Sequence, residues 1–395
     1  MFKAIASLPS TVWLLGLVSL FNDSASELVY PLVPLYLASV LMAGPKALGI
    51  IEGVAEATSS LLKLFSGVLA DRFGTTKGWV VGGYSLAALG RPLLALATSW
   101  PVVLALRFAD RVGKGLRTSP RDALLALSVR EDQRGLAFGL HRAMDNAGAV
   151  VGPLVAAVLL ASGMAIRDIL LWTLVPGVIT VVLALAVREP VRQPPPRRAA
   201  FGWTLQGFPP VFKRYLLVLA LFTLGNSSNM FLLLRAREVG LAEAQVPVLW
   251  ALVSLVAMVF STPLAALSDR VGRFRLILGG WAVYGAFYLL LGQIDASAAT
   301  LLWPLFAFYG LFLAATEGAE KALVADLAPG PFLGTAYGWF NLIAGIMLLP
   351  ASFLFGWLWQ TFSAEAAFSF SAACAALAAV LLKWWVGAGN SPRRT

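Results

Sequence analysis

Acidic residues stand inside apolar segments of this sequence, where an isolated charge is costly. Asp23 and Glu27 lie four residues apart in the first long apolar run, so a helix would place them on one face. Two carboxyl groups this close in apolar surroundings interact, and one of them can hold a proton. The pair is therefore a candidate for proton binding or substrate contact. The alternative is an ion pair with a nearby arginine that only holds helices together.

A fourth apolar segment, between Leu106 and Asp122, carries a polar stripe. Its members recur at helical spacing: Arg107, Asp110, Arg111, Lys114, Arg117 and Arg121. We place Arg107, Asp110 and Arg111 among the candidates for proton or substrate chemistry. Arg117 and Arg121 lie nearer the end of the segment and are candidates for gating. Contact with lipid headgroups, or salt bridges between helices, is the alternative for these two.

Further polar residues occupy other apolar segments. Asn226 and Asn229 are candidates for hydrogen bonding in a cavity, or equally between helices. We assign Glu317 to the cavity and Glu320 to a gate, in which acidic groups of their segment face the basic stripe. Arg91 is expected to form a structural pair with Glu52 or Glu56.

The segments that carry these residues must be membrane-spanning. Of 395 residues, 59% are hydrophobic and 13% are charged, and the mean hydropathy is +0.80. Soluble domains carry about a quarter charged residues, so a soluble enzyme, a disordered chain and a nucleic-acid binder are excluded despite the net charge of +10. Single Cys374 and His141 residues argue against disulfides and metal sites, and we expect no metal and no cofactor. No phosphate-binding loop supports ATP-driven transport, and no catalytic constellation supports an enzyme.

A membrane span needs roughly 20 apolar residues. The sequence predicts about twelve spans, at residues 11–41, 46–70, 79–99, 101–127, 135–161, 167–187, 215–238, 246–268, 275–294, 299–326, 333–359 and 363–386. Residues 188–214, with three consecutive prolines and six basic residues, form the predicted cytoplasmic linker between residues 1–187 and 215–395. Lys and Arg concentrate in one set of loops, which places both termini in the cytoplasm of a multi-pass protein of the cytoplasmic (inner) membrane.

The two halves look like repeats of each other. Asp71-Arg72-Phe73-Gly74 follows the second span, and Asp269-Arg270-Val271-Gly272 follows the eighth. The first and seventh spans also match, at Asn22 to Ser24 and Asn226 to Ser228. Repeated six-span halves are a transporter architecture with a site near the bilayer midplane. We therefore predict an all-α membrane protein with two pseudo-symmetric six-helix bundles around a central cavity.

Over essentially its whole length the sequence resembles the major facilitator superfamily. Residues that match its loop signature after the second span are Gly67, Leu69, Ala70, Asp71, Arg72 and Gly74. Thr75 and Thr76 stand where the signature usually has a basic pair. Gly148, Gly152 and Pro153 resemble the antiporter motif of the fifth span, with Ala156 and Ala157 replacing its last two glycines.

The resemblance implies residue roles. Asp71, Arg72 and Gly74, with the repeat residues Asp269 and Arg270, would control conformational change. In the same family the first span lines the cavity, and Arg107 aligns with an arginine associated with proton transfer. Gly148, Gly152 and Pro153 would allow close, kinked helix packing in this conformational machinery.

The leading functional prediction is a secondary active transporter that moves a small organic solute across the cytoplasmic membrane by alternating access. We expect proton-coupled export, that is, antiport and efflux. The alternatives are uptake or facilitated transport of an anionic solute, because the stripe is basic, or translocation of a lipid-like substrate. A membrane-embedded enzyme and a non-transporting sensor are the competing classes. Expected partners are the solute, protons and the lipid bilayer, without nucleic acid, and the protein is expected to be a monomer.

Overall fold

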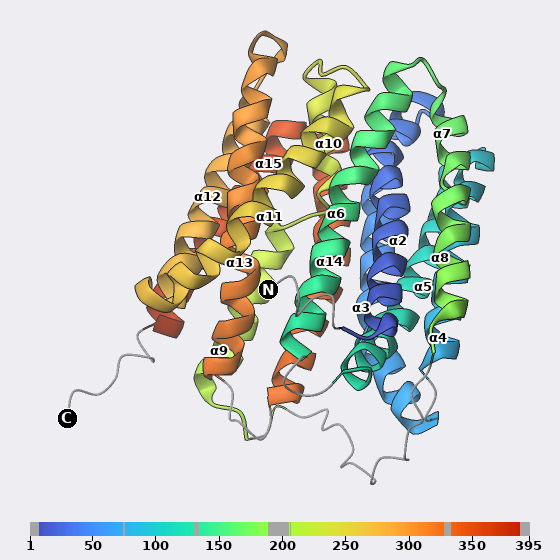
Figure 1. Cartoon of the computed structure of the whole chain (residues 1–395). Helices are drawn as coiled ribbons and strands as arrows, with labels where there is room; N and C mark the ends of the chain where they lie inside the picture. Colours follow the sequence, from blue (N-terminus) through green and yellow to red (C-terminus); the bar gives the residue numbers. More distant parts are fainter. Residues whose placement is uncertain are drawn as a thin grey trace. The chain divides into compact units, whose positions relative to one another are not determined.

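The structure is a computed structural model that describes residues 8–73, 76–129, 134–188, 205, 207–327 and 333–387. Within these ranges the chain is helical apart from short connections, and no strand occurs there (Figure 1). Gly74 and most of the predicted 188–214 linker lie outside the described residues. The chain forms two compact units, which are described separately below.

Unit 1 comprises the described residues within 1–43, 54–198 and 242–251. Its helices are α2 (Ser10–Leu35) with the π-helix η1 (Tyr36–Val40), α4 (Lys77–Leu93) with the 3₁₀-helix η2 (Leu94–Leu96), α5 (Trp100–Leu127), α6 (Arg134–Ala161), α7 (Ile166–Trp172) and α8 (Leu174–Ala186). The larger part of α3 (Pro45–Phe73) and the first residues of α11 (Gln245–Val271) also belong to it.

Unit 2 comprises the described residues within 44–53, 199–241 and 252–395. Its helices are α9 (Pro210–Gly225), α10 (Met230–Glu238), α12 (Arg273–Gln293), the 3₁₀-helix η4 (Ala296–Leu301), α13 (Leu302–Leu327), α14 (Leu333–Thr361), α15 (Ala364–Leu381) and the π-helix η6 (Leu382–Val386). The start of α3 and most of α11 complete it. Asp295 begins η4 by accepting hydrogen bonds from the backbone and hydroxyl of Ser297, which lower the pKa of its carboxyl.

Each predicted span coincides with one helix or with two consecutive helical segments of the structure. In the described residues, nine segments are long and apolar enough to cross a membrane by length and composition. Helices α3 and α5 are also long, with 29 and 28 residues. They are not among the nine apolar segments because they carry more charged side chains. Large apolar side chains are exposed on these helices, for example those of Val158, Leu185 and Leu217. Such an exposed apolar surface fits a lipid environment.

Glycines allow α2 and α6 to pack closely in unit 1. A Cβ atom at Gly148 would lie 2.6 Å from the carbonyl oxygen of Leu20 and 3.0 Å from the Cβ of Asp23. Gly152 faces the backbone of Ser24 and Leu28 in the same way, and both Gly152 and Pro153 are buried. The two backbones can approach this closely only because α6 has no side chain at these positions. The close contact fixes the register between α2 and α6.

Unit 2 is built around a cluster of stacked and edge-on aromatic rings. Phe222 of α9 stacks on Trp281 of α12 with ring centroids 4.2 Å apart, and Tyr284 stacks on Tyr288 at the same separation. Large rings of this kind bury much apolar area in one place and pack in preferred geometries. This cluster positions α9 against α12 and α13.

Candidate functional site

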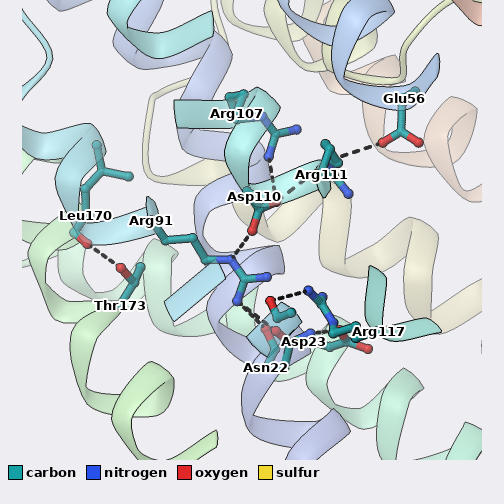
Figure 2. A network of polar contacts seen from close by, with 11 residues as sticks. Asn22, Asp23, Glu56, Arg91, Arg107, Asp110, Arg111, Arg117, Leu170 and Thr173 are labelled. Atoms are coloured by element: carbon teal, nitrogen blue, oxygen red, sulfur yellow. Dashed lines mark hydrogen bonds and ion pairs between the residues drawn. The ribbon is translucent and has the colours of Figure 1, made fainter. Parts of the chain in front are cut away.

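A buried ion pair joins α4 to α5 in unit 1. The Nε of Arg91 donates to Oδ1 of Asp110 at 3.0 Å, and both side chains are 4% exposed. The same guanidinium donates through Nη1 to the backbone oxygen of Asn22 at 3.0 Å and to its side-chain oxygen at 3.1 Å (Figure 2). Arg91 therefore ties α2, α4 and α5 together. The expected pairing of Arg91 with Glu52 or Glu56 is wrong, because Arg91 faces α5 and α2.

Asp110 also lies among the other arginines of α5. Its Oδ2 is 4.0 Å from Arg107 and 3.8 Å from Arg111. Arg111 reaches in the opposite direction to Glu56 of α3, at 3.4 Å, as Figure 2 shows. The helical spacing predicted from the sequence thus brings Arg107, Asp110 and Arg111 into one network, in which a single carboxylate is shared by several guanidinium groups.

Arg117 and Arg121 lie further along α5. Arg117 is buried, packs over the ring of Tyr84 at 4.6 Å and donates to the carbonyl of Gly83 at 3.4 Å. Arg121 pairs with Asp122 at 2.8 Å. Arg117 therefore connects α5 to α4, whereas Arg121 pairs with the next residue of α5. Both residues have structural contacts, and their assignment to gating stays a prediction.

Asp23 is connected to the arginine network through Asn22. The amide of Asn22 donates to Oδ1 of Asp23 at 2.7 Å, while its side-chain oxygen accepts from Arg91. Helix α6 packs against this part of α2, since a Cβ atom at Gly148 would lie 3.0 Å from the Cβ of Asp23. The hydroxyl of Ser19 donates to Asp145 at 2.7 Å. Asn22 and Asp145 are not among the predicted site residues, although Asn22 directly precedes Asp23.

Glu27 has a different environment, one turn further along α2. Its Oε2 accepts from the indole nitrogen of Trp250, at the start of α11, at 3.0 Å. Trp250 in turn stacks on Tyr30 with ring centroids 5.1 Å apart. Asp23 and Glu27 share one helix as predicted, but each is bonded to its own partners.

The seventh predicted span is interrupted in unit 2. Helix α9 ends at Gly225 and α10 begins at Met230, with Asn226 at φ −95° and ψ 77° between them. Asn229 accepts from the hydroxyl of Tyr309, and Ser228 donates to the buried Glu52 at 3.3 Å. A break at membrane depth is tolerated where neighbouring side chains satisfy the backbone or where it lines a cavity, and broken helices form transporter substrate sites.

The other predicted site residues either have side chains that the structure does not describe or make contacts outside the arginine network. Glu320 accepts from the indole nitrogen of Trp281 at 3.0 Å. The backbones of Asp71, Arg72, Asp269, Arg270 and Glu317 are helical, but their side chains lie outside the described ones. The predicted pairing of acidic groups on α13 with basic groups on α5 stays a prediction.

Long apolar helices, buried ion pairs and an interrupted span are features that membrane transporters share. The model of the Major Facilitator Superfamily matches residues 12–235 and 215–395. The chain therefore belongs to this superfamily and is a multi-pass transporter, not an enzyme. Membership implies a small-molecule substrate and a membrane environment.

Relatives and solved structures agree with this assignment. The uncharacterized MFS-type transporter MJ1317 of Methanocaldococcus jannaschii is 33% identical over 382 residues, which cover 95% of this chain and 94% of that protein. The multidrug resistance protein MdtH of Photorhabdus laumondii is 29% identical over 347 residues, covering 84% and 82%.

Two crystal structures share the fold. The nucleoside transporter NupG has a TM-score of 0.77 at 13% identity and covers 95% of this chain and 98% of its own. The POT family transporter PepTSo has a TM-score of 0.79 at 13% identity, covering 97% and 98%. The predicted all-α fold with two helical bundles is confirmed.

Proposed function

We propose that the protein is a proton-coupled secondary transporter that exports a small organic solute from the cytoplasm by alternating access. The observation that carries the proposal is the position of Asp23 on α2. Its carboxyl group accepts a hydrogen bond from Asn22 and is linked through Asn22 to the buried Arg91 of α4, which pairs with Asp110 of α5. A carboxyl group inside a span is costly and favours a functional explanation. The similarity to MdtH supports export.

The protonation state of Asp23 has a direct route to the helices around it. Asn22 donates to Asp23 and accepts from Arg91, which holds Asp110 on α5. A proton that neutralises Asp23 weakens the hydrogen bond from Asn22, because hydrogen bonds to ionised acceptors are the stronger ones. The contact between α2 and α4 then changes with proton binding, which is the coupling that antiport requires.

An anionic solute is the second candidate, and the charge balance of α4 and α5 favours it. Among the described residues of these two helices, the buried charged side chains are four arginines and one aspartate: Arg91, Arg107, Arg111, Arg117 and Asp110. An excess of buried positive charge would attract a carboxylate or phosphate group of a substrate.

Flux measurements on the purified full-length protein in liposomes test the proposal. Vesicles with an acidic interior receive ethidium, leucine, succinate or a labelled phospholipid outside. We expect ethidium to accumulate above the level in protein-free vesicles, and a proton ionophore to abolish the accumulation. Succinate movement that is indifferent to the pH gradient would favour the second candidate. Movement of the phospholipid alone would favour a lipid-like substrate.

A further inference from the structure

A buried carboxyl group lies beside the interruption of the seventh predicted span. We propose that Glu52 of α3 is a positioning residue of the solute site: through the hydroxyl of Ser228 it holds the connection between α9 and α10 in its non-helical form. The inference rests on the proposed function, because an interrupted span serves a transporter by presenting polar groups to the solute. Glu52, Ser228 and the connection all belong to unit 2.

The hydroxyl of Ser228 links this carboxyl group to the start of α10. Its Oγ accepts from the backbone N–H of Met230 at 3.3 Å and donates to Oε2 of Glu52, also at 3.3 Å. The backbone N–H of Ser228 donates to Oγ of Ser352 on α14 at 3.2 Å. The first backbone donors of a helix have no partner within it, and Ser228 and Ser352 supply acceptors for two of them. Glu52 fixes the direction of the Ser228 hydroxyl, since an ionised carboxylate only accepts hydrogen bonds.

The charge of Glu52 and the start of α10 stabilise each other. Glu52 is 1% exposed and lies in a predicted span, where a charge is costly unless its surroundings compensate it. The N-terminus of α10, a helix of nine residues, carries partial positive charge and favours an acidic group close to it. A hydrogen bond to an ionised acceptor is also stronger than one between neutral groups. The contact therefore favours the arrangement in which a new helix begins at Met230.

Close packing of the start of α3 fixes the place of Glu52. A Cβ atom at Gly53 would lie 3.0 Å from a backbone carbonyl oxygen of α14. Gly49 faces the carbonyl of Ser352 on α14 and the ring of Phe231 on α10. Glu52 stands between these two glycines, so the backbone that carries it lies directly against the helices on both sides of the contact.

The matching serine of the other half has a different partner. Ser24 of α2 stands where Ser228 stands in the matching segment, and its hydroxyl donates to the carbonyl of Leu20, four residues earlier in the same helix, at 2.7 Å. That segment is helical throughout. Ser228 donates to another helix instead, and its span is interrupted. The partner of the serine hydroxyl thus distinguishes the interrupted span from the continuous one.

The position of Glu52 also makes a polar contact in the other half. Glu52 lies 19 residues before Asp71, and Trp250 lies 19 residues before the matching Asp269. Trp250 donates to Glu27 of α2, the helix that corresponds to the interrupted span. The same position of the two matching halves therefore binds the polar part of the first or the seventh span. This recurrence supports a positioning role for Glu52.

Hydrogen–deuterium exchange of the purified full-length protein, at one fixed pH and without substrate, tests the contact in a double-mutant cycle. We expect Glu52→Gln and Ser228→Ala each to speed exchange at residues 226–230 about tenfold, the worth of one hydrogen bond to a charged group. The double variant should be no faster than the single variants, because both changes remove the same contact. Glu365→Gln, at an exposed carboxylate at the start of α15, is the matched control and should change nothing there. Exchange in α12 should stay at the wild-type level in every variant, which separates a local change from loss of fold.

Additive effects in the double variant, or wild-type exchange in Glu52→Gln, would overturn the inference. Transport supplies a second measurement. Glu52→Gln should raise the KM for ethidium about tenfold and change the maximal rate less, because fewer molecules hold the site in its binding form. An unchanged KM would contradict the inference alone. Wild-type vesicles without gradient-driven flux would contradict the proposed function, while non-additive exchange would still support the contact between Glu52 and Ser228.

Discussion

The guanidinium of Arg91 donates to the carboxylate of Asp110 at 3.0 Å, between two side chains that are both almost fully buried. Removing one partner of a buried ion pair typically costs about 3–5 kcal/mol, because the other charge loses its compensation. The two partners are not equivalent here. Asp110 lies within 4.0 Å of three arginines, whereas Arg91 has both Asp110 and Asn22.

We therefore predict that Asp110→Asn destabilises the protein more than Arg91→Gln does. The first change leaves Arg91, Arg107 and Arg111 around a neutral group, while the second leaves Asp110 with two cations. Thermal unfolding in detergent measures the order. Arg142→Gln is the control, because its 58% exposed side chain should contribute at most about 1 kcal/mol. An equal or reversed order of the two variants would show that the carboxylate is not the centre of the network.

Gly148→Ala should weaken the contact between α2 and α6. The added Cβ would meet the backbone oxygen of Leu20 at 2.6 Å, and backbone in a packed helix cannot move aside cheaply. We expect a lower unfolding temperature and loss of gradient-driven flux. Gly82→Ala on α4 is the matched control, since its Cβ would meet nothing within 4 Å. That change should be neutral or slightly stabilising, because alanine favours a helix by about 1 kcal/mol over glycine. Similar behaviour of both variants would contradict the close-packing argument.

The positions of the spans followed from the sequence because length and apolar content decide them, and twelve predicted spans match the helices. The contact partners of the polar side chains could not be predicted from the sequence in the same way. Arg91 was expected to face α3, yet it binds Asp110 and Asn22, because helix rotation decides which face meets which neighbour. Glu27 and Trp250 are 223 residues apart, and no local pattern links them.

The two matching polar segments, Asn22 to Ser24 and Asn226 to Ser228, also show what the local sequence does not predict. Asn22 to Ser24 stays helical in α2, where Ser24 donates back to the carbonyl of Leu20 at 2.7 Å. The matching run after Gly225 breaks the span, with Asn226 leaving the helical region. The sequence predicts polar groups at both places but does not show that only the second run interrupts its helix.

Trp250→Phe should alter the response of transport to pH. The change removes the indole donor from Glu27 while keeping a ring to stack on Tyr30. Glu27 loses its indole donor, because a phenylalanine ring cannot donate a hydrogen bond. We expect the pH profile of flux in liposomes to differ from that of wild type. Trp384→Phe, at an exposed tryptophan, is the control. An unchanged profile would separate Glu27 from the coupling step.

Glu320 offers a test of charge against hydrogen bonding. Glu320→Gln keeps an acceptor for the indole of Trp281, whereas Glu320→Lys removes the acceptor and reverses the charge. If the carboxylate acts in a gate, both variants insert normally into membranes but transport poorly. Membrane fractionation measures insertion, and vesicle flux measures transport. Normal flux in Glu320→Gln would reduce the residue to a structural contact with Trp281.

The central claim is that Asp23 couples solute movement to protons. Its most direct test compares ethidium accumulation in acid-loaded liposomes containing wild type or Asp23→Asn, with equal amounts of folded protein. We predict gradient-driven accumulation for wild type and none above protein-free vesicles for the variant. Downhill ethidium movement without a pH gradient should persist in both proteins. Equal gradient-driven accumulation by the two proteins would contradict the claim.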